Sequence, residues 1–90
     1  MHEQGLIRDL VRKLEAIAAE EAPRRMVGAR VVIGALAHIS ADHFRDHFAR
    51  AVAGTPLASL ALEVVEETDV ADPRAQEILL ESVVVAEGES

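Results

Sequence analysis

The sequence predicts an α+β domain in which two helices cover one face of a three-stranded mixed sheet, in the chain order α-β-α-β-β. Two segments carry apolar residues at helical spacing, and three others are rich in β-branched residues. Half of the 90 residues are apolar, which is enough for one packed core, and the length corresponds to a single domain over residues 1–90.

The first helix is expected over residues 6–18. Its apolar residues recur three and four positions apart, which places them on one face, while charged residues such as Arg8 and Asp9 occupy the other face. The apolar set is Leu6, Ile7, Leu10, Val11, Leu14, Ile17 and Ala18. Pro23 cannot continue a helix and biases the residue before it away from helical angles, so we expect the helix to end near Glu21.

The second helix is expected to begin after Ser40, whose hydroxyl suits an N-cap. Gly54 is expected just beyond its end, since glycine adopts the left-handed conformation that often terminates helices, and Pro56 follows two residues later. The predicted buried stripe consists of Phe44, Phe48, Ala51 and Val52. The two phenylalanines are the chain's only aromatic residues, so the rest of the core must be aliphatic.

Three strands are expected. The first, over residues 26–36 and closed near Gly34, is rich in β-branched residues and alternates in part. The second, over residues 60–67, shows alternation, and the third is expected over residues 78–85. A helical link between the first two strands makes them parallel if they share the sheet. The polar connection at 68–75 contains an Asp-Pro pair and is too short for a parallel crossover. The second and third strands are therefore expected to be antiparallel neighbours.

Charge and cysteine content exclude several classes of function. The net charge of −7 disfavours a nucleic-acid partner, because affinity for phosphate backbones is largely supplied by cations. The absence of cysteine excludes disulfides, thiolate zinc sites and cysteine nucleophiles from these residues. No apolar run approaches the roughly 18 residues of a membrane span, and no signal-peptide pattern opens the chain. A cytoplasmic protein without membrane attachment is the expectation.

The first three residues form a candidate metal site. A terminal amine on Met1, the imidazole of His2 and the carboxylate of Glu3 are three potential donors. The simpler interpretation is a frayed start before the first helix, because chain termini are usually solvated. Spacing alone favours the simpler interpretation.

A pair of histidines four residues apart forms the second candidate. His43 and His47 would project from one side of the second helix at the spacing that helical metal sites use, although the HExxH motif is absent. Because they stand beside Phe44 and Phe48 of the predicted core stripe, a boundary or exposed position without metal is the ordinary expectation. His38 precedes the same helix and is a weaker candidate.

The sequence offers little for catalysis. It contains no GxSxG motif and no glycine-rich phosphate loop, and its carboxylates are scattered. Ser40 is expected to be a cap, Ser59 a turn residue and Ser82 part of a strand. We therefore expect a protein that is not an enzyme.

Three short motifs carry a resemblance to a known family. Met1-His2-Glu3 precedes the first helix, Ile33-Gly34-Ala35-Leu36 ends the first strand, and Gly54-Thr55-Pro56-Leu57 stands ahead of the second strand. With these motifs in this order, nearly the whole chain resembles the nickel-incorporation family of hydrogenase maturation, the HypA/HybF type.

The resemblance implies a nickel metallochaperone that assists maturation of a nickel metalloenzyme such as a nickel–iron hydrogenase. In that family the histidine after the initiator methionine binds Ni(II) together with backbone nitrogens, and the next glutamate tunes the site; these positions are His2 and Glu3 here. The implied partners are a HypB-type nickel GTPase and the hydrogenase large subunit. A homodimer is also allowed, because an edge strand can pair with a second copy.

One departure from the family concerns zinc. Its members carry two CxxC pairs in a zinc module, whereas this chain has no cysteine and only a short loop near residues 68–76 at that place. No structural zinc is therefore expected. Two interpretations stay open, a nickel-binding accessory protein and a metal-independent interaction module or scaffold in a hydrogenase-related assembly.

Overall fold

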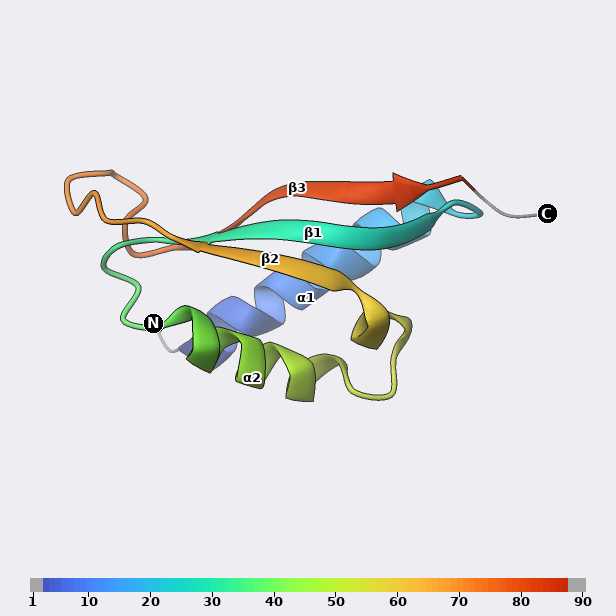
Figure 1. The fold of residues 1–90 in the computed structure, drawn as a ribbon, viewed down its shortest axis with the longest axis horizontal. Coiled ribbons are helices and arrows are strands. Elements are labelled where there is room, and N and C mark those ends of the chain that lie inside the picture. Colours follow the sequence, from blue (N-terminus) through green and yellow to red (C-terminus); the bar gives the residue numbers. More distant parts are fainter. Residues whose placement is uncertain (1–2, 88–90) are drawn as a thin grey trace.

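Residues 3–87 are described by the computed structural model, and they form two helices packed on a three-stranded sheet. The elements are α1 (Glu3–Glu21), β1 (Arg25–Ile33), α2 (Ala41–Val52), the 3-10 turn η1 (Pro56–Ser59), β2 (Ala61–Glu66) and β3 (Ile78–Ala86). Both helices lie on the same side of the sheet (Figure 1). The predicted α+β class and the order α-β-α-β-β are confirmed. Across residues 3–87, no helix is both long and apolar enough to cross a membrane.

The strand order in the sheet is β2-β1-β3, with β1 at the centre. β1 pairs in parallel with β2, as the helical crossover predicts, and antiparallel with β3. The expectation that β2 and β3 are antiparallel neighbours is wrong, because β1 lies between them. β1 contains more buried residues than either of the other strands. Its central place agrees with this, because β2 and β3 cover its two edges.

The connection from β2 to β3, residues 67–77, crosses the end of β1. Gly34 N–H donates to the Glu77 carbonyl at 2.9 Å, and Leu36 N–H donates to the Ala75 carbonyl at 2.7 Å. The approach is so close that a Cβ atom on Gly34 would lie 2.1 Å from the Ala75 carbonyl oxygen. This connection is therefore held in place by backbone hydrogen bonds rather than forming the simple turn that the sequence suggested.

The ends of the elements follow local signals closely. α1 ends at Glu21, as Pro23 predicted. Ser40 caps α2 by accepting a hydrogen bond from the His43 N–H at 3.1 Å, and Gly54 adopts a φ of 80° just after the C-cap. β1 ends at Ile33, directly before Gly34, near which the sequence predicts the strand to close.

The core lies between the helices and the sheet. Phe44 and Phe48 stack at a centroid distance of 5.8 Å and are almost completely buried. Ala51 is exposed, so its place in the predicted stripe is wrong; the buried residues of α2 follow a single i, i+4 row that ends at Val52. The largest fully buried side chains are Phe44, Leu14, Ile33 and Val31.

Candidate metal site

Only one of the two predicted terminal ligands falls within the described residues. His2 lies outside the described residues, and Glu3 is the first residue of the helix. α1 packs against α2, and the groove between them is lined from α1 by Ile7, one helical turn beyond Glu3. The beginning of α1 is therefore positioned against α2 by apolar packing.

The groove between α1 and α2 has a volume of about 430 Å³ and combines apolar walls with basic side chains. Arg8 of α1 and Arg50 of α2 line it together with Val11, His47 and other residues. Arg50 is also paired with Asp46 at 3.0 Å, one turn earlier in the same helix. Sequence reasoning missed this groove, although the three-residue spacing of His47 and Arg50 places them on one side of α2.

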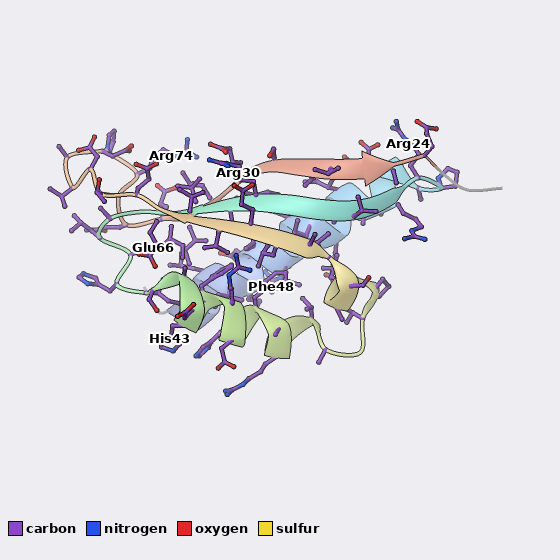
Figure 2. The ribbon with its side chains drawn as sticks, viewed as in Figure 1. Arg24, Arg30, His43, Phe48, Glu66 and Arg74 are labelled. Carbon is purple, nitrogen blue, oxygen red and sulfur yellow. The ribbon has the colours of Figure 1, made fainter. Side chains whose placement is uncertain are left out.

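His43 and His47 come together on α2 as their spacing predicts. Their ring centroids are 4.5 Å apart and the ring planes meet at 64°. His43 is exposed in the first turn of the helix (Figure 2), whereas His47 is half-buried along the groove. The expected boundary or exposed positions beside Phe44 and Phe48 are confirmed.

His38 does not join this pair in a metal-binding group. It is exposed in the connection between β1 and α2, with a φ of 62° in the left-handed region. Among the side chains of residues 5–87, no three or more His, Asp or Glu gather in a group that could hold a metal ion. The described residues therefore offer two adjacent imidazoles rather than a complete set of protein ligands.

A network of charges occupies the middle of the sheet face that the helices leave uncovered. Arg30 of β1 donates to Glu63 of β2 at 2.7 Å and to Glu81 of β3 (Figure 2). The hydrogen bond to Glu81, together with the attraction of both carboxylates, raises the pKa of Arg30 above its ordinary value, so this guanidinium remains charged. The sequence could not indicate the network, because it depends on the strand order.

The serines have structural contacts. Ser40 accepts the capping hydrogen bond of α2, and Ser59 Oγ donates to the Pro56 carbonyl at 3.3 Å within η1. Ser82 lies exposed in β3. These positions agree with the cap, turn and strand roles that the sequence predicts for them.

Comparison with known proteins identifies the family to which the chain is similar. A family described as hydrogenase/urease nickel incorporation, metallochaperone, hypA matches residues 1–75. The chain is 40% identical over 70 residues to the hydrogenase maturation factor HypA of Chloroflexus aggregans, and to that of Chloroflexus aurantiacus. Each match covers 78% of this chain and 60% of the relative.

The chain thus spans about 60% of the length of the curated relatives it matches. The family match nevertheless runs through both helices, β1 and β2, and reaches the connection that crosses the end of β1. Since it covers well over half of these 90 residues, the chain belongs to the HypA family of hydrogenase/urease nickel incorporation.

Proposed function

We propose that this protein is a nickel-binding accessory protein that assists maturation of a nickel metalloenzyme such as a nickel–iron hydrogenase. The observation that supports this most directly is the family match over residues 1–75, which includes His2 and Glu3. Nickel is the cargo here, taken up and passed on, so the protein would act by binding and release rather than by catalysis.

In this proposal His2 and Glu3 hold the nickel ion. An imidazole, a terminal amine and backbone nitrogens form a field of nitrogen donors that suits Ni(II) and Cu(II) better than Mg(II) or Ca(II). The imidazole must be neutral to bind metal, so nickel affinity should fall as the pH drops through the ordinary range of histidine. A terminal site would also suit transfer, because chain termini are usually solvated and open to a partner.

We further propose that residues 1–90 act as a single cytoplasmic domain without structural zinc. The absence of cysteine removes the thiolate ligands of the family's zinc module, and the connection 67–77 is held by backbone hydrogen bonds instead. The proposed partners are a HypB-type nickel GTPase and the hydrogenase large subunit. A homodimer through the edge strands β2 or β3 is a further proposal.

Nickel titration of the purified protein, produced with Met1 as its untagged first residue, tests the terminal site. The parent should bind Ni(II) through this site, with a diamagnetic square-planar spectrum if backbone amides take part. His2→Ala should remove that spectrum and leave the far-ultraviolet circular dichroism unchanged. An extension by one residue should weaken the site in the same way, because it displaces the amine. If the variant keeps the parent spectrum, the terminal site is wrong.

A pull-down experiment separates nickel delivery from a metal-independent scaffold. Recovery of a hydrogenase large subunit or its GTPase partner should fall when His2 and Glu3 are both replaced by alanine. Chelator should lower recovery with the parent protein for the same reason. Equal recovery of parent and variant, with and without chelator, would favour the interaction module or scaffold instead.

A further inference from the structure

We propose that His43 and His47 form a second metal site, which binds Ni(II) or a similar imidazole-preferring divalent cation across one turn of α2. The proposed ligands are different from His2 and Glu3, and the proposal goes beyond the proposed function. It rests on the placement of the two rings, on their accessibility and on the charges around them.

The separation of the two rings suits coordination to one ion. In a metal–imidazole bond the metal–nitrogen distance is about 2.1 Å, and the ring centroid lies about 1.1 Å further along the same line. Two imidazoles bound to one ion at about 90° to each other therefore have centroids about 4.5 Å apart. The centroids of His43 and His47 are 4.5 Å apart in the structure. The centroid separation is therefore compatible with both rings binding one ion.

The backbone beneath the pair is well held. Ser40 caps the first turn of α2 through the His43 N–H, and the neighbouring residues Phe44 and Phe48 are packed in the core. The helix is thus fixed before any metal arrives, so little backbone ordering would oppose binding. A rigid helix also holds the two imidazoles on one side, four residues apart.

Accessibility and charge permit a cation at this place. His43 is exposed and His47 is half-buried beside an open groove, so an ion can reach both rings from solvent. Arg8 and Arg50 both line the same groove, and Asp46 pairs with the Arg50 guanidinium at 3.0 Å and offsets its charge. The overall charge of −7 favours cation binding in general. Among the side chains of residues 5–87, no third His, Asp or Glu completes a metal group, so water would fill other coordination positions and the affinity should be moderate.

The test uses the His2→Ala protein, in which the terminal site is disabled. Calorimetric titration should still show binding of about one Ni(II) per chain to this variant. The melting temperature should rise by about 5–10 °C at a nickel concentration about tenfold above the dissociation constant, because an ion that bridges one helical turn stabilises the folded state. Adding His43→Gln or His47→Gln should each abolish both effects, whereas the matched control His38→Gln should leave them unchanged.

The possible outcomes separate this site from the terminal one. If His2→Ala binds no nickel although the parent does, the pair on α2 is overturned and the terminal site stands. If His2→Ala still binds but His43→Gln and His47→Gln make no difference, the pair is again overturned. Loss of the remaining binding on replacing either histidine, with the circular dichroism unchanged, supports the pair regardless of the role of His2.

Discussion

Phe48 connects α2 to the rest of the core. Its side chain is only 4% exposed and stacks on Phe44, which is fully buried. The chain has no Tyr or Trp and no other Phe, so the remaining core residues are aliphatic and cannot replace the volume of a lost ring. At the residue scale, the stability of this small domain therefore depends strongly on this pair.

Replacing Phe48 with alanine should lower the free energy of unfolding by about 3–5 kcal/mol, because it removes a buried ring and leaves a cavity. A domain of this size has a total stability of about 5–15 kcal/mol, so the variant should be close to unfolding. Urea denaturation followed by circular dichroism measures the change. Val84→Ala is the control, since Val84 is 58% exposed and should change stability by less than about 0.5 kcal/mol. A loss below about 1 kcal/mol in Phe48→Ala would show that the ring contributes little to the core.

At the scale of single elements, the connection between β2 and β3 is hydrogen-bonded to the chain that follows β1. Its residues accept hydrogen bonds from the chain just after β1, and Ala75 is buried against Gly34. Glycine is required at position 34 because of this close approach, and its φ angle is not the cause. In the family motif Ile33-Gly34-Ala35-Leu36, the glycine thus marks the place where the connection docks.

Gly34→Ala should destabilise the protein by about 1–3 kcal/mol, since the new methyl group overlaps backbone atoms of Ala75 that cannot rotate away. Thermal unfolding measures the loss, and amide hydrogen exchange locates it: protection should fall at Leu36, whose N–H donates to Ala75. Gly28→Ala is a milder control, because its added Cβ would lie 3.3 Å from the nearest atom. Unchanged stability and exchange in Gly34→Ala would mean that the connection does not dock tightly in solution.

At the scale of the whole molecule, a continuous apolar core supports the fold. Buried residues from α1, α2, the second half of β1 and the start of β3 form one cluster, and the 90 residues contain no cysteine. The Arg30 network links all three strands on the opposite face of the sheet. The fold that we describe is therefore expected to form without metal.

Chelator treatment should leave the melting temperature of the protein as purified essentially unchanged. A domain whose folding free energy comes from a bound metal would instead unfold when the metal is removed. Thermal unfolding with and without EDTA makes the comparison, and the same protein loaded with Ni(II) serves as the positive control for metal effects. A large drop in melting temperature on chelation would contradict a metal-independent core.

Much of the fold could be predicted from residues close together in the chain. The ends of α2 followed from Ser40 and Gly54, and the end of α1 followed from Pro23, because caps and helix breakers act over a few residues. The side-by-side position of His43 and His47 likewise follows from helical geometry. The family was also recognisable, since its motifs are short and keep their order along the chain.

The sequence by itself determined the fold class, the apolar faces of the helices and the histidine pair, because periodicity and caps are local constraints. It also determined that β1 and β2 run in parallel if they share a sheet, because the helical crossover between them is short. Only the tertiary structure decided that β3 lies beside β1, that the connection docks on Gly34, and that Arg30 meets Glu63 and Glu81. These arrangements join residues that are distant along the chain. They depend on which strand occupies the centre of the sheet. The packing of the whole core decides this, because the strand with the most buried residues is stabilised most when both of its edges are covered.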